Sequence, residues 1–555
     1  MKQGDKNILN YKRKNRIKVL RVTLQILFLT VIASIFLKTL IYDGRYRQTD
    51  TKNWESQNGF VALSFPEVTR LEKPAKIMKT QFDKYLNYLR RAGFTSISQE
   101  DILKFYGENG KLPNKSLFLM IDSASKNSVQ FAQPILDKYQ YKASILTYGS
   151  VLENEENSNI SLKDIAALKK TGFWEFGTNG YRLAYINVFG KDSSFAPILY
   201  PEEFMGAEKT TYYNHYLMDF IRNKYMIPVE TRKEMEERVN NDYGLMESAY
   251  KNYFGFMPDL YVLMNANSPY YGSNKMTGDV NLSNIKRLFK MSFNKEGSGL
   301  NTKERDIYDL TRIQVDPNWP MNHFVTRIKK DSKDDIDFAT GKKSFWEKWD
   351  EIKGAAEFDG NKIVLTSPQG EEGKIYLKGS ENYGDIKINT TISSNIQGRL
   401  SFYLKCDSEA QSYIRVTFHD NNILIEQKIP ESINITKVLE KTLDSKDNQL
   451  RDINISLKNN TITVMSDSAV VADSVEFDSN IDQSGIALSS KYDEEQLGDK
   501  IYDSVFTDLH ISKEVKTAEG KEQILYDNRY TILDKVTNSI KFGCDFIINW
   551  FIEKF

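Results

Sequence analysis

Residues 116–146 read SLFLMIDSASKNSVQFAQPILDKYQYKASIL, and this stretch decides the fold class. Its first six residues, Ser116–Ile121, form a continuous apolar run, which is typical of a parallel strand buried on both faces. A helix is predicted around residues 129–136, and the next strand over Ala143–Tyr148. A strand, a helix and a second strand joined by short turns indicate a parallel sheet.

The flanking sequence repeats this alternation on both sides. An upstream strand is predicted over Phe60–Phe65, and the helix that follows ends at Gly93, with Phe82, Tyr85, Leu86 and Leu89 on one face. Downstream, Ser161 is placed to cap a helix that Gly172 ends, and FWEF (173–176) follows as a strand. At this length, the pattern predicts an α/β fold built as a (β/α) barrel, with chemistry at the carboxyl ends of its strands.

The order and spacing of these segments resemble the polysaccharide deacetylases of carbohydrate esterase family 4. The resemblance rests on VALSFPEV, LPNKSLFLMIDSAS and FWEFGTNGYRL, runs from about residue 59 to 325, and includes LTRIQV (310–315) as a closing segment. A helix-rich insertion is predicted around residues 232–254. The resemblance implies a distorted (β/α) barrel over residues 55–330 and, in the family, metal-dependent removal of N-acetyl groups.

The family's catalytic residues are largely replaced in this sequence. Where the family has two adjacent aspartates, IDSAS keeps Asp122 in the base position but has Ser123 in place of a metal ligand. Where it has two histidines, GTNGYRL has Asn179 and Leu183. These side chains cannot replace imidazole or carboxylate ligands, so we predict no metal, no cofactor and no confident catalytic residue. No counterpart of the family's base-orienting arginine is found in NANSPYYG (265–272).

The remaining polar and aromatic residues near the strand ends are predicted to contact a glycan, because sugar rings have apolar faces and a hydroxylated rim. An equal alternative is that the aromatic residues are barrel core and the polar residues structural remnants. The candidates are Asp122, Trp174, Glu175, Asn179, Tyr181, Arg182, Tyr270 and Tyr271.

A second domain is predicted over residues 340–515. Ten short alternating strands with turns between them indicate a β-sandwich of the jelly-roll type. The layout resembles concanavalin-like and laminin-G-type domains, which often bind carbohydrate, so the domain is predicted to be a glycan-binding module or, equally, a spacer or protein-docking domain. Cys406 is predicted to be a small buried residue with no reason to pair with Cys544.

Both ends of the chain point to a membrane. Residues 1–21 carry a net charge of +7, although the chain as a whole is neutral, with 75 basic and 75 acidic residues. The apolar residues 22–42 match the length of a transmembrane helix, and the basic flank places the N-terminus in the cytoplasm and most of the chain outside the cell. A cleaved signal peptide is the less favoured alternative. Within residues 525–555, an amphipathic helix is predicted to contact lipid, a partner or its own chain.

These features favour one function over two alternatives. The neutral charge argues against a nucleic-acid partner. We predict a single-pass, non-catalytic accessory subunit of an exopolysaccharide synthase or secretion complex, which binds or guides a β-glycan beside a membrane glycosyltransferase. The alternatives are a surface deacetylase or other glycan hydrolase with an atypical site at Asp122, and a cell-surface lectin.

Overall fold

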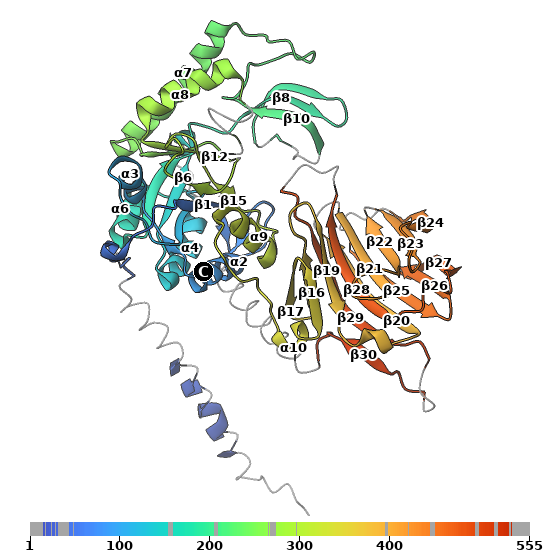
Figure 1. Ribbon diagram of the computed structural model, residues 1–555. Helices are drawn as coiled ribbons and strands as arrows, with labels where there is room; N and C mark the ends of the chain where they lie inside the picture. Colours follow the sequence, from blue (N-terminus) through green and yellow to red (C-terminus); the bar gives the residue numbers. More distant parts are fainter. Residues whose placement is uncertain are drawn as a thin grey trace, which may run out of the picture.

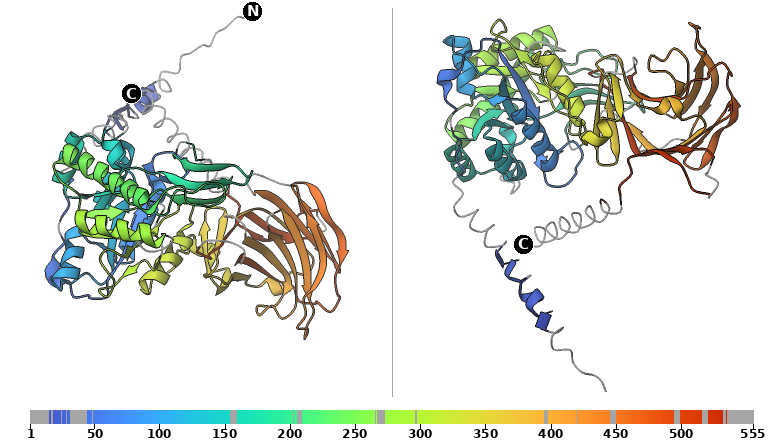
Figure 2. Two further views of the ribbon diagram at one scale, coloured as in Figure 1. Left: turned by 90° about the horizontal axis from the view of Figure 1, so that it is seen from above. Right: turned by 60° about the horizontal axis from the view of Figure 1, so that its bottom comes forward.

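A computed structural model describes an α/β barrel followed by a β-sandwich, which lie side by side (Figures 1 and 2). It describes residues 44–531 except 48, 154–158, 202, 205–208, 265, 267–272, 296, 395–397, 420, 445–449, 494–498 and 516–519. It also describes residues 15, 16, 18–23, 25–27, 29, 30 and 534. The predicted fold classes of the two domains are confirmed.

The barrel is built on a ten-stranded sheet in which two consecutive short strands nearly close the ring. β14 pairs with β12 and β15 pairs with β1, so the chain crosses the seam between residues 311 and 313. The parallel strands are β1 (Phe60–Phe65), β5 (Ser116–Ile121), β6 (Ala143–Thr147), β7 (Trp174–Thr178), β11 (Leu260–Val262), β12 (Met291–Asn294), β14 (Leu310–Thr311) and β15 (Ile313–Gln314). β4 (Thr95–Ser96) pairs parallel with β5, β13 (Leu300–Asn301) antiparallel with β1, and β2 (Val68–Thr69) with β3 (Ile77–Met78).

Helices cover the outside of this sheet, and their apolar faces and capping residues explain where they form. α2 (Lys79–Arg91) buries the predicted apolar face, and capping boxes at Ser98 and Ser161 begin α3 (Gln99–Gly107) and α6 (Leu162–Thr171). Gly172 ends α6 in the left-handed conformation, at φ 78°. The other barrel helices are α4 (Lys126–Tyr139), α5 (Gly149–Glu153), α8 (Lys275–Leu288) and α9 (Met321–Ser332).

An insertion after β7 adds a small sheet and a long helix. β8 (Tyr185–Gly190), β9 (Phe195–Leu199) and β10 (Thr210–His215) form an antiparallel sheet that the sequence did not predict. Their aromatic side chains do not alternate with polar ones, so the usual strand signal is missing. α7 (Arg232–Phe254) coincides with the predicted helix-rich insertion.

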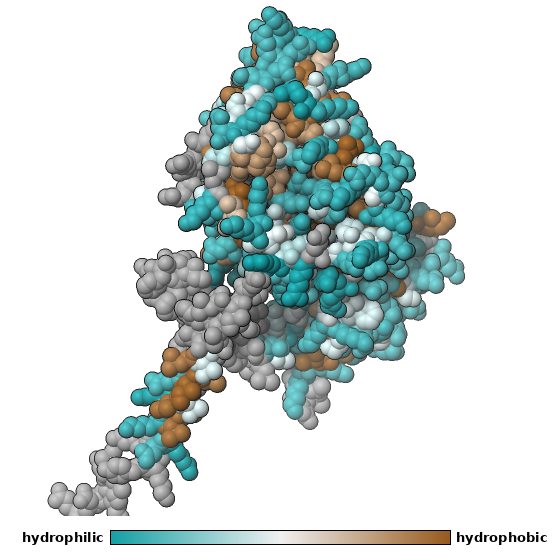
Figure 3. Space-filling view, turned by 90° about the vertical axis from the view of Figure 1, so that its left-hand side faces the viewer, coloured by the Kyte–Doolittle hydropathy of each residue, from teal (hydrophilic) through white to brown (hydrophobic). Residues whose placement is uncertain are grey.

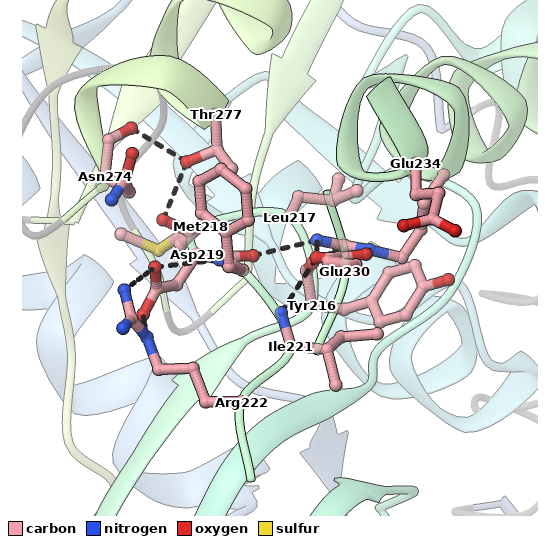
Figure 4. Close-up of polar contacts among 12 residues, drawn as sticks. Tyr216, Leu217, Met218, Asp219, Ile221, Arg222, Glu230, Glu234, Asn274 and Thr277 are labelled. Carbon is pink, nitrogen blue, oxygen red and sulfur yellow. Dashed lines mark hydrogen bonds and ion pairs between the residues drawn. The ribbon is translucent and has the colours of Figure 1, made fainter. Parts of the chain in front are cut away.

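Buried polar contacts hold the segment after β10 against α7 and α8 (Figure 4). Arg238 on α7 donates to Glu230 at 2.7 Å and to the carbonyl of Asp219 at 2.8 Å. Thr277 on α8 donates to the carbonyl of Met218 at 2.9 Å. The Arg238 hydrogen bonds are charge-assisted and therefore stronger than neutral ones, so they join the segment after β10 firmly to α7.

The sandwich consists of two antiparallel sheets with a shared apolar core. The seven-stranded sheet contains β16 (Trp349–Lys353), β19 (Glu372–Leu377), β28 (Gly485–Tyr492), β21 (Gly398–Cys406), β22 (Tyr413–His419), β23 (Asn422–Lys428) and β24 (Thr436–Thr442). The eight-stranded sheet contains β17 (Ala355–Asp359), β18 (Lys362–Thr366), β29 (Asp503–Lys513), β20 (Ile386–Ser394), β25 (Arg451–Lys458), β26 (Thr461–Ser466), β27 (Ala469–Glu476) and β30 (Ile524–Asp527). α10 (Lys343–Trp346) precedes the first strand, and Cys406 is buried as a free thiol.

The predicted membrane segments fall mostly outside the described residues. Helical residues between 15 and 30 expose apolar side chains, including Val19, Ile26 and Leu27 (Figure 3). Residues 31–42 of the predicted span and residues 535–555 of the predicted C-terminal helix are not described. Among the described residues, no helix is both long and apolar enough to cross a membrane. Residues 524–527 form β30 rather than helix, because they pair with the edge of β29.

Candidate functional site

A buried cluster of polar side chains occupies the carboxyl ends of the barrel strands. We call Ser64, Asp122, Tyr148, Asn179 and Arg312 the strand-end cluster. Ser64 lies in β1, Asp122 follows β5, Tyr148 follows β6, and Asn179 follows β7. Arg312 lies between β14 and β15, where the sheet closes. Because the strands are parallel, residues at their ends meet on one face of the barrel.

Asp122 is the predicted base, and it is held in an environment that favours its neutral form. Its side chain is 7% exposed, and its backbone N–H donates to the carbonyl of Phe65 at 2.8 Å. Burial raises the pKa of Asp122 to about 6, while the charge of Arg312 and the nearby Ser64 hydroxyl act in the opposite direction. Neither carboxylate oxygen has hydrogen-bond geometry with any residue in the described part of the chain. Asp122 is therefore able to exchange a proton near neutral pH.

Arg312 supplies a positive charge near Asp122, which residues 265–272 cannot do because they contain no lysine or arginine. It is 1% exposed, and its Nε donates to the Ser64 hydroxyl at 3.2 Å while Nη2 donates to the carbonyl of Leu263 at 3.3 Å. Burial lowers the pKa of Arg312, and the charge of Asp122 opposes this. An arginine in this role was expected in residues 265–272, after β11, whereas Arg312 lies between β14 and β15. The available signal was a single arginine inside the apolar strand LTRIQV, where a charge is rarely tolerated without a partner.

The residues at the family's metal-ligand positions do not form a metal site. Asn179 is fully buried, and its Nδ2 donates to the backbone carbonyl of Asp122 at 3.4 Å. Ser123 and Leu183 are both half-buried. A hydroxyl, an amide and an aliphatic side chain do not match the ligands that zinc or similar ions prefer. In the part of the chain that is described, no three His, Cys, Asp or Glu residues lie close enough to hold an ion.

Two predicted site residues lie at the other end of the barrel. Trp174 and Glu175 begin β7, whereas Asn179 follows its last residue. Trp174 is 3% exposed and its indole N–H donates to Gln133. Glu175 accepts from the backbone N–H of Gln99 at 2.9 Å, and burial raises its pKa to about 7. These contacts hold α3 and α4 against the sheet, so both residues are separated from Asp122 by the length of the strand.

Arg182 has a structural contact close to the cluster. Its Nε donates to Asp242 on α7 at 3.1 Å, and its guanidinium lies 5.4 Å from the ring centre of Tyr181 and 5.2 Å from that of Tyr216. Tyr181 and Arg182 therefore join the loop after β7 to the insertion, and both remain partly exposed. The last two candidates, Tyr270 and Tyr271, lie outside the described residues.

Comparison with known sequences supports the resemblance in the barrel. The chain is 30% identical over 114 residues to poly-beta-1,6-N-acetyl-D-glucosamine N-deacetylase of Staphylococcus aureus strain MSSA476, a match covering 20% of this chain and 39% of the relative. The enzyme of strain MRSA252 matches at 30% over 110 residues, or 19% and 38% of the two chains. The chain thus spans about two fifths of the length of these relatives. No family model matches it.

Several solved structures are similar to parts of the chain. A de-N-acetylase from Aggregatibacter actinomycetemcomitans matches with a TM-score of 0.37 at 15% identity, covering 48% of this chain and 99% of that one. IcaB from Ammonifex degensii matches with a TM-score of 0.34 at 14% identity, covering 47% and 93%. Carbohydrate binding module CBM66 from Bacillus subtilis matches with a TM-score of 0.24 at 12% identity, covering 30% and 94%. The predicted resemblance is confirmed: the chain carries a polysaccharide-deacetylase-like domain.

Proposed function

We propose that this protein is a membrane-anchored, non-catalytic subunit of an exopolysaccharide synthase or secretion complex. Its deacetylase-like barrel binds or guides the glycan outside the membrane, next to a membrane glycosyltransferase. One observation carries the proposal: Asp122 and Arg312 remain at the barrel's open end, while Ser123, Asn179 and Leu183 occupy the metal-ligand positions. Tyr148, Tyr181 and Arg182 remain partly exposed beside these buried residues, and such aromatic and polar groups can bind a sugar without any metal.

The membrane part of the proposal rests on the sequence. A basic segment over 1–21 followed by the apolar segment 22–42 is typical of an anchor with a cytoplasmic N-terminus. The domain that follows would then meet a polymer as it leaves the membrane. The relatives act on an N-acetylglucosamine polymer according to their names, so a glycan of this kind is the first ligand to test.

The decisive experiment combines a binding partner with an activity assay. The full chain should co-purify from detergent-solubilised membranes with a glycosyltransferase, and deletion of the gene should reduce polymer secretion. The purified protein should release no acetate from acetylated oligosaccharides. Normal polymer output after deletion would contradict the proposal.

A second candidate function is a glycan hydrolase with an atypical site. The observation that favours it is the buried Asp122, whose pKa of about 6 suits a general base and which faces the charge of Arg312. Acetate release that Asp122→Asn abolishes, while the variant keeps its fold, would establish this candidate instead.

A further inference from the structure

The barrel and the sandwich line a half-open cavity of about 500 Å³ at their junction. On the barrel side it is lined by Gln81 and Lys84 of α2 and by Trp319, which precedes α9. On the sandwich side it is lined by Glu357 of β17 and Lys362 of β18. A volume of this size lies within the range of small-molecule binding sites.

The cavity lies at the same end of the barrel as the strand-end cluster. β1, which carries Ser64, leads into the loop that lines the cavity before α2, and β15, which follows Arg312, leads to Trp319. Both loops leave the carboxyl ends of parallel strands. A polymer chain bound at the barrel's open end can therefore extend toward the cavity along its rim.

Trp319 is held in place before any ligand arrives. Its backbone carbonyl accepts hydrogen bonds from the Tyr85 hydroxyl at 2.6 Å and from Gln81 at 3.3 Å. Its indole ring stacks on the imidazole of His323, with ring centres 4.7 Å apart and planes 17° apart. An aromatic ring that is already ordered loses little conformational freedom when it contacts a ligand.

The polar groups around Trp319 both donate and accept hydrogen bonds. Lys84 reaches across the junction to Asp359 at 3.1 Å, and Gln81 and Lys362 also line the cavity. Burial raises the pKa of Glu357 to about 7, with Asp359 adding to the rise, so its carboxyl both donates and accepts near neutral pH. An aromatic face surrounded by such groups matches a sugar ring, which has apolar faces and hydroxyls at its rim.

We propose that the cavity between the domains is a second glycan subsite, which binds a pyranose unit of the same chain that contacts the barrel. Trp319 stacks on the sugar ring, and Glu357, Gln81 and Lys362 bind its hydroxyls. This inference rests on the proposed glycan-binding function. It also gives the sandwich a role, because neither domain forms the subsite alone.

The test measures binding of β-1,6-linked N-acetylglucosamine oligomers, two to eight units long, to the full chain by calorimetry. Trp319→Phe keeps a ring against His323, and Glu357→Met keeps the length of the side chain but removes its hydrogen-bonding groups. Each should weaken binding of the longest oligomers about tenfold and leave binding of the dimer to the barrel unchanged. Glu440→Met, on exposed strand β24, is the matched control and should bind like the natural protein.

The outcomes separate this inference from the function on which it rests. If Asp122→Asn weakens binding but Trp319→Phe and Glu357→Met do not, the barrel binds glycan and the cavity is not a subsite. If the natural protein binds none of the oligomers, nor their de-N-acetylated forms, the proposed function fails together with this inference. Loss of long-oligomer binding in both cavity variants, with unchanged thermal unfolding, would support it.

Discussion

The junction between the two domains should weaken as pH rises, because a buried histidine holds it through two carboxylates. His323 on α9 is 2% exposed. Its Nδ1 lies 2.6 Å from Asp503 of β29, and its Nε2 lies 2.7 Å from Asp499. With a carboxylate at each ring nitrogen, the imidazole is held in its doubly protonated, charged form.

The size of the effect follows from the pKa of His323. Burial lowers it, but the charges and hydrogen bonds of Asp503 and Asp499 more than reverse this and raise the pKa from 6.5 to about 9. At 1.36 kcal/mol per pKa unit, this difference is worth about 3 kcal/mol. Because the folded-state pKa is the higher one, the stabilisation is complete below pH 6.5 and is lost as pH rises through about 9.

The perturbation is His323→Gln, which keeps a polar side chain but cannot carry the charge. We expect the variant to lose about 3 kcal/mol of unfolding free energy at pH 6, and much less at pH 10, where the natural histidine is neutral too. Urea unfolding at several pH values measures this, and small-angle scattering reports whether the domains separate. His419→Gln is the control, since His419 pairs with Asp493 inside the sandwich.

One result would refute the reasoning about charge. If His323→Gln loses the same free energy at pH 6 and pH 10, the histidine acts through packing against Trp319 and not through its charge. If the loss of unfolding free energy in His419→Gln depends on pH as it does in His323→Gln, the pH effect is not specific to the junction between the domains.

Three further perturbations test the barrel. Because burial raises the pKa of Asp122 to about 6, ionising this residue destabilises the fold, and the natural protein should lose about 3 kcal/mol of unfolding free energy as pH rises from 4 to 7. Asp122→Asn should not show this loss. Arg312→Met removes the charge that faces Asp122 and should cost about 3–5 kcal/mol by urea unfolding, and less in an Asp122→Asn background. In Gly177→Ala the new Cβ would lie 2.6 Å from Leu146, so we expect a loss of about 1–3 kcal/mol, whereas Gly244→Ala, with open space around it, should lose nothing.

Much of the barrel could be predicted because its signals are local. The apolar runs at 60–65 and 116–121 match β1 and β5 to the residue, and Ser161 caps the predicted helix. The position of Asp122 directly after a buried strand placed it at the open end. The positions of Trp174 and Glu175 could not be predicted in this way, because a short apolar run does not show which of its residues lie near the carboxyl end of the strand.

The sequence by itself determined the two fold classes, the strand-end position of Asp122 and the loss of the metal-ligand side chains, because each depends on residues close together in the chain. Only the tertiary structure decided what faces Asp122 and what joins the domains. Arg312 meets Ser64 across 248 residues, and His323 meets Asp503 across 180. Periodicity shows which side of a strand or helix is buried, but partners so far apart are chosen by how the barrel closes and how the sandwich packs against it.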